Sequence, residues 1–189
     1  MPSYSQRYAM NWPNLITCFR MLLIPLVVLS YHSDLQYANV LAAVLFTLAS
    51  LSDWLDGYLA RRLNQTSEFG AFLDPVADKL LVVTALIMLV GELNSLLAPT
   101  IVIIAREVLI SALREWMATR GHREVVAVAF SGKLKATFQM VAIVALILVT
   151  ENSPNWLLMA GYIMICAGAL MSLYSALHYF KAARPHLTP

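Results

Sequence analysis

The sequence has 189 residues, of which 60% are hydrophobic and 13% are charged. Soluble domains carry charge on about a quarter of their residues, so this composition excludes an ordinary soluble domain and predicts an integral membrane protein. A net charge of +2 is too small to favour nucleic acid as a partner. No linker, repeat or low-complexity tract divides the chain, which predicts one domain over residues 1–189.

Residues 1–12 are polar and aromatic, and we expect them to lie along the membrane surface. No small-residue cleavage signature follows the first apolar stretch, which predicts a retained span and not a signal peptide. Lipid satisfies no backbone hydrogen bonds, so spans of about 20 apolar residues predict helices. The expected fold is therefore all-α and polytopic, with six transmembrane helices at about 15–30, 36–60, 75–90, 98–117, 134–150 and 156–180.

Lysine and arginine are placed on one side of this predicted topology. The loops YHSDLQ, VGELNS and TENSPN contain neither residue. The opposite loops and chain ends contain Arg7, Arg61, Arg62, Arg120, Arg123, Lys181 and Arg184. By the positive-inside rule we expect both termini in the cytoplasm.

The stretch 52–79, SDWLDGYLARRLNQTSEFGAFLDPVADK, concentrates charge at the cytoplasmic end of the second and third predicted spans. It contains two pairs of aspartates, Asp53 with Asp56 and Asp74 with Asp78. Helical spacing puts Asp53 and Asp56 within an arc of roughly 140°, a face that also includes Gly57, Ala60 and Arg61. Asp74 and Asp78, spaced i and i+4, share a face of the next helix.

Ionised carboxylates beside a bilayer are costly unless they are paired or bind metal. Oxygen ligands without His or Cys indicate Mg²⁺ or Mn²⁺, one ion or two, and such sites hold phosphates. Small Gly57 and Ala60 would leave room for a ligand beside the helix, with Arg61 as a phosphate partner. The alternative for these two small residues is close helix packing.

A basic group lies in the fourth span and at the start of the fifth, and comprises Arg106, Arg114, Lys133 and Lys135. One interpretation is an anion pocket for a phosphate-bearing substrate, because a buried cation needs a partner. The other is that the arginines pair with acidic residues and the lysines anchor the helix ends. His178, well inside a span, is expected to pack in the core.

Eight residues of the aspartate stretch match the signature of the CDP-alcohol phosphatidyltransferase family, D-x2-D-G-x2-A-R-x8-G-x3-D-x3-D, without departure: Asp53, Asp56, Gly57, Ala60, Arg61, Gly70, Asp74 and Asp78. The blocks NLITCFR, FGAFLDPVADK, IAREVLISALREWMA and GKLKATFQM extend the resemblance over nearly the whole chain. They resemble the bacterial branch whose acceptor is sn-glycerol 3-phosphate.

The resemblance implies a homodimer in the bacterial cytoplasmic membrane, each protomer with six spans and a polar cavity open to the cytoplasm. It implies transfer of the phosphatidyl group from CDP-diacylglycerol to sn-glycerol 3-phosphate, giving phosphatidylglycerol phosphate and CMP. Asp53, Asp56, Asp74 and Asp78 would hold two divalent metals, Mg²⁺ or Mn²⁺, with Asp78 as catalytic base. The implied CDP-diacylglycerol contacts are Asn14, Thr17, Gly57, Ala60, Arg61, Ser67 and Gly70. The basic group Arg106, Arg114, Lys133 and Lys135 would bind glycerol 3-phosphate.

Three alternatives stay open at this point. A sibling transferase would use another acceptor, such as inositol phosphate, serine or phosphatidylglycerol; the basic group disfavours serine. A divalent-metal transporter would also have acidic residues, but nearer mid-membrane and with related halves of the chain. A structural scaffold gives no reason for four clustered aspartates.

Overall fold

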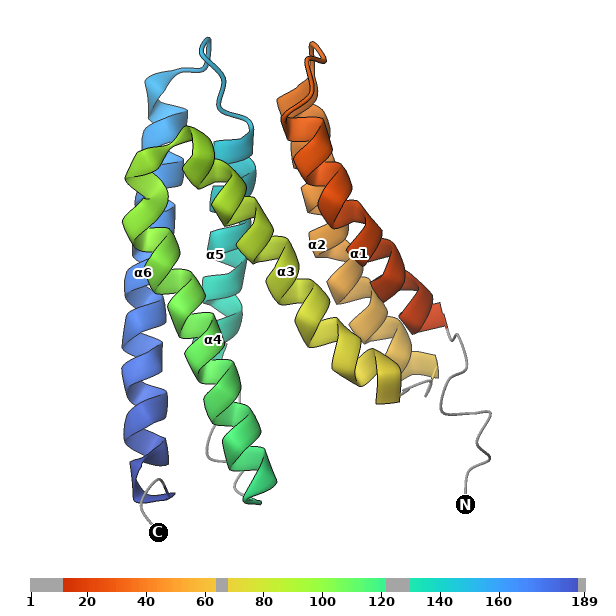
Figure 1. Cartoon of the computed structure of the whole chain (residues 1–189), viewed down its shortest axis with the longest axis vertical. Coiled ribbons are helices and arrows are strands. Elements are labelled where there is room, and N and C mark those ends of the chain that lie inside the picture. The colour runs from red at the N-terminus through yellow and green to blue at the C-terminus, as the bar shows by residue number, and fades with distance from the viewer. Residues whose placement is uncertain (1–11, 64–67, 122–129, 187–189) are drawn as a thin grey trace. The chain divides into compact units, whose positions relative to one another are not determined.

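The computed structural model describes residues 12–63, 68–121 and 130–186, without the side chains of residues 12–14, 53–63, 68–69, 71, 130–135 and 186. This part of the chain contains helices and no strand, as the composition predicts. The α-helices are α1 (Trp12–Tyr31), α2 (Ala38–Leu63), α3 (Glu68–Glu92), α4 (Leu97–Thr119), α5 (Phe130–Ile147) and α6 (Asn155–Ala183), with 3₁₀ turns η2 (Asn94–Leu96) and η4 (Arg184–His186) (Figure 1).

Within the described ranges, two stretches are long and apolar enough to cross a membrane: Asn94–Thr119, with 26 residues, and Asn155–Ala183, with 29. Shorter apolar stretches lie at Leu15–Tyr31, Ala38–Ser52 and Ala136–Ile147. These lengths and compositions fit a membrane protein. The count of six crossings stays a prediction.

The third helix extends beyond the membrane span predicted to begin near Pro75. Helix α3 begins at Glu68 and continues through Pro75. Proline removes one backbone N–H donor and disfavours helix in the residue before it, but the hydrogen bonds of the adjacent turns remain. Asp74 is therefore inside a helix, one turn before Asp78 on the same element.

The chain forms two compact units, of which the first comprises Met1–Met88 and Ile147–Asn152. Helices α1 and α2 pack side by side within it (Figure 1). The Asn39 side-chain amide donates to the carbonyl oxygens of Ile147 at 2.8 Å and Val149 at 3.1 Å. One of these carbonyls belongs to the last residue of α5, where carbonyls have no partner within the helix, and the other lies just beyond it. The bonds join chain segments far apart in sequence.

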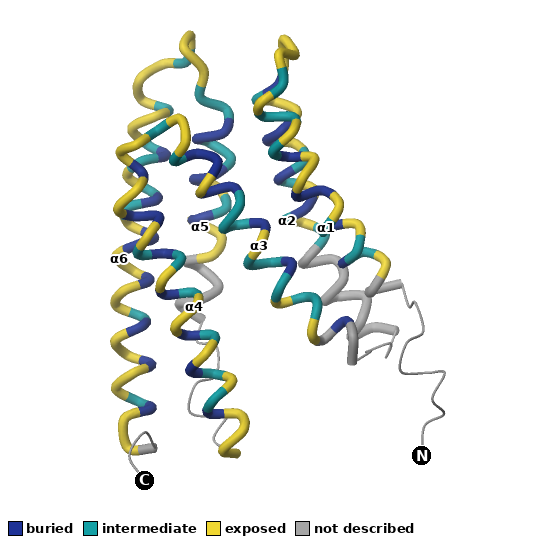
Figure 2. The backbone as a smooth tube through the Cα atoms, in the orientation of Figure 1, coloured by how far each residue is buried: buried dark blue, intermediate teal, exposed yellow. Residues whose placement is uncertain are grey.

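The first half of α1 buries two polar residues and exposes apolar ones. Thr17 and Arg20 are fully buried, whereas Phe19 and Leu22 are 54% and 66% exposed. Figure 2 shows this alternation along the tube of α1. A helix that exposes apolar side chains and buries a cation fits contact with lipid. In a soluble protein the apolar side chains would face the interior and the cation would face water.

The second unit comprises Leu89–Leu146 and Ser153–Pro189, and its helices α4 and α6 pack against each other. A cluster of Ile110, Leu113 and Met117 on α4 meets Ala176, Tyr179 and Ala183 on α6. The buried positions of α6 recur every three or four residues (Figure 2). His178 is exposed, so its predicted core packing is wrong, because the buried positions here are Ala176 and Tyr179.

A glycine with positive φ lies two residues after the end of α4 at Thr119. Gly121 has φ of +79°, and its N–H donates to the Ala118 carbonyl at 3.1 Å. Only glycine adopts this left-handed conformation without steric cost, and it commonly ends helices.

Candidate active site

The four aspartates of the signature lie on two consecutive helices, as predicted. Asp53 and Asp56 are on α2, and Asp74 and Asp78 are on α3, all within the first compact unit. The side chains of Asp74 and Asp78 are half-buried and one helical turn apart. Those of Asp53 and Asp56 lie outside the described residues, so the common pocket of four carboxylates stays a prediction.

Asp74 is held by a residue from α1. The hydroxyl of Thr17 donates a hydrogen bond to Asp74 Oδ1 at 2.5 Å. A bond between a hydroxyl and a charged carboxylate is short and about twice as strong as one between neutral groups. Thr17 thus joins α1 to the second aspartate pair.

A second contact joins α1 to α2 at the residue that precedes the first aspartate pair. Arg20, fully buried, donates from Nε to Ser52 Oγ at 3.3 Å, and Ser52 Oγ donates to the Ala49 carbonyl at 2.7 Å. Ser52 directly precedes Asp53. The sequence analysis gave Arg20 no role of its own, although a cation inside an apolar span is a functional signal.

The described donors fit a hard divalent cation. Asp74 and Asp78 offer only carboxylate oxygens, which suit Mg²⁺ and Mn²⁺. Among the described side chains no group of three or more His, Cys, Asp or Glu residues forms a metal site. The predicted ligand set therefore depends on Asp53 and Asp56, whose side chains are not described.

The other residues predicted to contact CDP-diacylglycerol are described in part. Gly57, Ala60 and Arg61 lie on α2, and Asn14 lies on α1. The side chains at these four positions are outside the description, and Ser67 is outside the described residues entirely. Gly70 is buried on α3. These assignments stay predictions.

The basic group belongs to the second compact unit. Arg106, 8% exposed, forms an ion pair with Glu107 through Nη1 at 2.7 Å and donates from Nη2 to Ser175 Oγ at 3.0 Å. Its buried Nε has no hydrogen-bond partner in the described structure. The ion pair matches the pairing alternative for Arg106, whereas a role with phosphate stays a prediction.

Arg114, two turns further along α4, also contacts α6. It donates from Nη2 to the Tyr179 hydroxyl at 3.3 Å, and its guanidinium carbon lies 5.3 Å from the centre of that ring. Its Nε is likewise buried without a hydrogen-bond partner among the described residues. Lys133 and Lys135 are on α5, with side chains outside the description.

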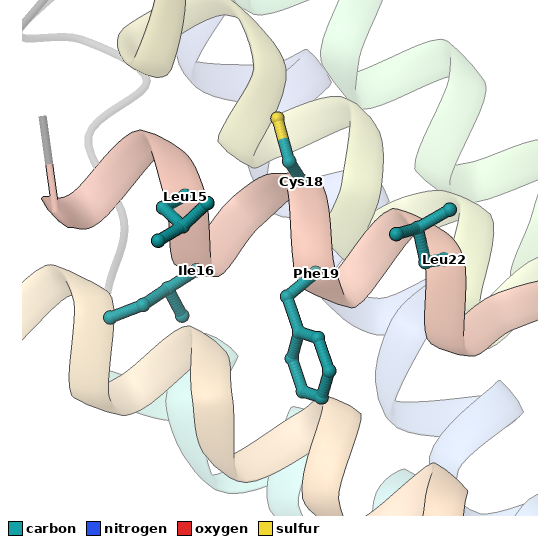
Figure 3. A pocket seen from close by; sticks show the side chains of 5 residues that line it. All are labelled: Leu15, Ile16, Cys18, Phe19 and Leu22. Carbon is teal, nitrogen blue, oxygen red and sulfur yellow. The ribbon is translucent and has the colours of Figure 1, made fainter. Parts of the chain in front are cut away.

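An apolar hollow of about 500 Å³ lies along α1 (Figure 3). Its described lining residues are Leu15, Ile16, Cys18, Phe19 and Leu22, and none of these five has a carboxylate, amine or guanidinium. At about 100° per residue, most of this lining faces away from Thr17 on the same helix. The described lining of this hollow therefore offers no oxygen ligand for a metal and no carboxylate for acid–base chemistry.

Comparison with known proteins agrees with the signature. Residues 10–173 match the family model for CDP-alcohol phosphatidyltransferase. Because this match covers most of the chain, the protein belongs to the CDP-alcohol phosphatidyltransferase family.

Two of its relatives are named CDP-diacylglycerol–glycerol-3-phosphate 3-phosphatidyltransferase. The protein of Salmonella choleraesuis (strain SC-B67) is 45% identical over 180 residues, covering 94% of this chain and 97% of the relative. The protein of Escherichia coli (strain K12) is 46% identical with the same coverage.

Proposed function

We propose that this protein transfers the phosphatidyl group from CDP-diacylglycerol to sn-glycerol 3-phosphate, releasing CMP. The observation that carries this assignment is the identity of about 45% over nearly the full length of enzymes named for that reaction. The complete aspartate signature supports it. The product, phosphatidylglycerol phosphate, is a precursor of acidic phospholipids.

In the proposed reaction the acceptor hydroxyl oxygen attacks the phosphorus that bears diacylglycerol. A new phosphorus–oxygen bond forms there, and the bond from that phosphorus to CMP breaks. Asp78 is the proposed general base and takes the hydroxyl proton. General-base catalysis by a positioned side chain contributes about 10²- to 10⁴-fold.

Asp53, Asp56, Asp74 and Asp78 are the proposed ligands of two divalent cations. When bound, Mg²⁺ or Mn²⁺ would neutralise the pyrophosphate and the charge that develops on CMP. The oxygen-only chemistry of Asp74 and Asp78 supports this assignment. Asn14, Gly57, Ala60, Arg61, Ser67 and Gly70 are the proposed contacts of CDP-diacylglycerol. Thr17, also expected among them from the sequence, instead donates its hydroxyl proton to Asp74.

Arg106, Arg114, Lys133 and Lys135 are the proposed site for the phosphate of the acceptor. The support for the arginines is that each has a buried Nε–H without a hydrogen-bond partner in the described structure. A buried donor left unsatisfied costs about 1–3 kcal/mol. An arriving phosphate oxygen would remove this cost.

We further propose a homodimer in the bacterial cytoplasmic membrane, with both termini in the cytoplasm. The apolar helices support the assignment to a membrane. The one-sided placement of Lys and Arg supports the orientation of the termini. CDP-diacylglycerol is a membrane lipid and glycerol 3-phosphate is a cytoplasmic metabolite. An active site at the cytoplasmic face would reach both.

An acceptor panel tests the function. Purified full-length protein with CDP-diacylglycerol and Mg²⁺ or Mn²⁺ is given glycerol 3-phosphate, inositol phosphate, serine or phosphatidylglycerol separately, and CMP release is measured. We expect release with glycerol 3-phosphate, loss in excess chelator and recovery on adding metal. Preference for another acceptor would indicate a sibling transferase. Metal binding without CMP release from any acceptor would favour the transporter alternative.

A further inference from the structure

Thr17 has an unusual position for a polar residue in an apolar helix. It is fully buried, while neighbouring residues of α1 such as Phe19 and Leu22 are exposed. Burying a hydroxyl is costly unless it forms a hydrogen bond. The bond from Thr17 to Asp74 Oδ1, at 2.5 Å, supplies that compensation across 57 residues of sequence.

The bond also restricts the carboxylate that receives it. The terminal torsion of an aspartate has a broad, roughly two-fold energy profile, so an unrestrained carboxylate samples many orientations. A hydrogen bond to Oδ1 from a buried donor on another helix reduces this freedom. Thr17 is β-branched and therefore has few rotamers itself, which makes it a rigid donor.

The geometry separates this role from direct contact with substrate. A threonine hydroxyl has one proton, and here it points at Asp74. That proton is not available to a nucleotide phosphate while the bond exists. Full burial of the side chain likewise keeps it from the surface that a substrate would touch.

We propose that Thr17 is a positioning residue: it fixes the Asp74 carboxylate in the orientation that binds the divalent cation. The proposal rests on the proposed function, in which Asp74 is a metal ligand. Hydrogen-bond partners of metal ligands typically contribute 10- to 100-fold to metal affinity or activity.

The test measures metal binding directly, without lipid substrate. Mn²⁺ is titrated into detergent-solubilised full-length protein, and free Mn²⁺ is followed by electron paramagnetic resonance. Thr17→Val removes the hydroxyl and preserves the shape, so we expect about a 10- to 100-fold weaker Mn²⁺ affinity. Thr17→Ser retains the hydroxyl, and its affinity should stay within about threefold of wild type, well short of that loss.

Thr47→Val is the matched control. Thr47 is half-buried on α2 in the same compact unit, and its hydroxyl donates to the backbone carbonyl of Ala43 at 2.7 Å. Losing that bond should leave Mn²⁺ affinity unchanged. If Thr17→Val does not fold, Thr17→Ala compared with Thr17→Ser isolates the hydroxyl in the same way.

The outcomes separate this inference from the proposed function. If wild type binds Mn²⁺ and the hydroxyl-free variants bind it equally well, Thr17 does not position a metal ligand. If those variants raise only the KM for CDP-diacylglycerol, Thr17 is a substrate contact and the inference is wrong. If wild type binds no divalent cation, the metal site of the proposed function fails, and the inference fails with it.

Discussion

Asp78 combines two proposed duties, metal ligand and general base, in one half-buried carboxylate on α3. Asn has the same shape but cannot accept the proton of the acceptor hydroxyl. We expect Asp78→Asn to lower turnover by roughly 10²-fold or more, measured as CMP release by protein that elutes and unfolds like wild type. Turnover within a few-fold of wild type would remove Asp78 from the mechanism. Bound Mn²⁺ should be counted in the same variant, to separate loss of the base from loss of metal.

Arg106 and Arg114 have described partners in the second compact unit: Glu107 and Ser175 for Arg106, and Tyr179 for Arg114. Replacing either with Gln removes the charge but retains much of the length, which limits packing loss. If each receives the acceptor phosphate, a charge-assisted contact of about 1.5–3 kcal/mol predicts a loss of about 10- to 100-fold in kcat/KM for glycerol 3-phosphate. The KM for CDP-diacylglycerol should change much less.

Two controls distinguish the phosphate pocket from a structural role of the arginines. Glu107→Gln removes the ion-pair partner of Arg106 and keeps the Arg106 charge. The kcat/KM for glycerol 3-phosphate should therefore not fall in this variant. Plain glycerol lacks the phosphate, and its slow use should scarcely change in the arginine variants. A parallel loss for glycerol and glycerol 3-phosphate would mean that these arginines support the fold only.

At the scale of elements, α5 and α6 approach closely at a glycine. A Cβ atom added to Gly161 would lie 2.6 Å from Leu146 Cγ and 2.7 Å from Leu146 Cδ2, far inside normal contact. Since Leu146 is itself 1% exposed, it has little room to move. We expect Gly161→Ala to lower the free energy of unfolding by about 1–3 kcal/mol, the usual cost of overpacking.

Gly91→Ala is the matched control for that substitution. Gly91 also lies in a helix, α3, but a Cβ atom there would meet nothing within 4 Å. Alanine is the better helix former, so this variant should be as stable as wild type or more stable by up to about 1 kcal/mol. Both are measured by reversible unfolding in mixed micelles. Equal stability of the two variants would contradict close packing at Gly161.

At the scale of the whole molecule, the orientation in the membrane is open to a labelling test. Single cysteines replace Gln65, His122 or Asn152 in a background with Cys18→Ser and Cys166→Ser. From the placement of Lys and Arg we expect an impermeant thiol reagent outside intact cells to label position 152 only. Permeabilised cells, in which all three positions should react, provide the control. The reverse pattern would place the aspartates on the wrong side for a cytoplasmic acceptor.

The helices were predictable from the sequence because apolar runs and backbone hydrogen bonding are local properties. The helix ends were less predictable. Helix α3 begins at Glu68, seven residues before the span expected from Pro75, and α5 begins at Phe130 and ends at Ile147, earlier at both ends than the expected span. A helix end depends on capping and on packing by other segments, which periodicity does not contain. The exposure of His178 likewise depends on which face of α6 packs against other segments, and the sequence pattern did not indicate that face.

The sequence by itself determined the family and the residue types of the site, because the spacing of four aspartates, two glycines and an arginine is a property of the chain alone. Only the tertiary structure decided which residues meet. The bond from Thr17 to Asp74 crosses 57 positions, that from Arg106 to Ser175 crosses 69, and that from Arg20 to Ser52 crosses 32. Such pairs depend on how helices pack against one another, and local propensity carries no information about which side chains that packing brings within hydrogen-bond distance.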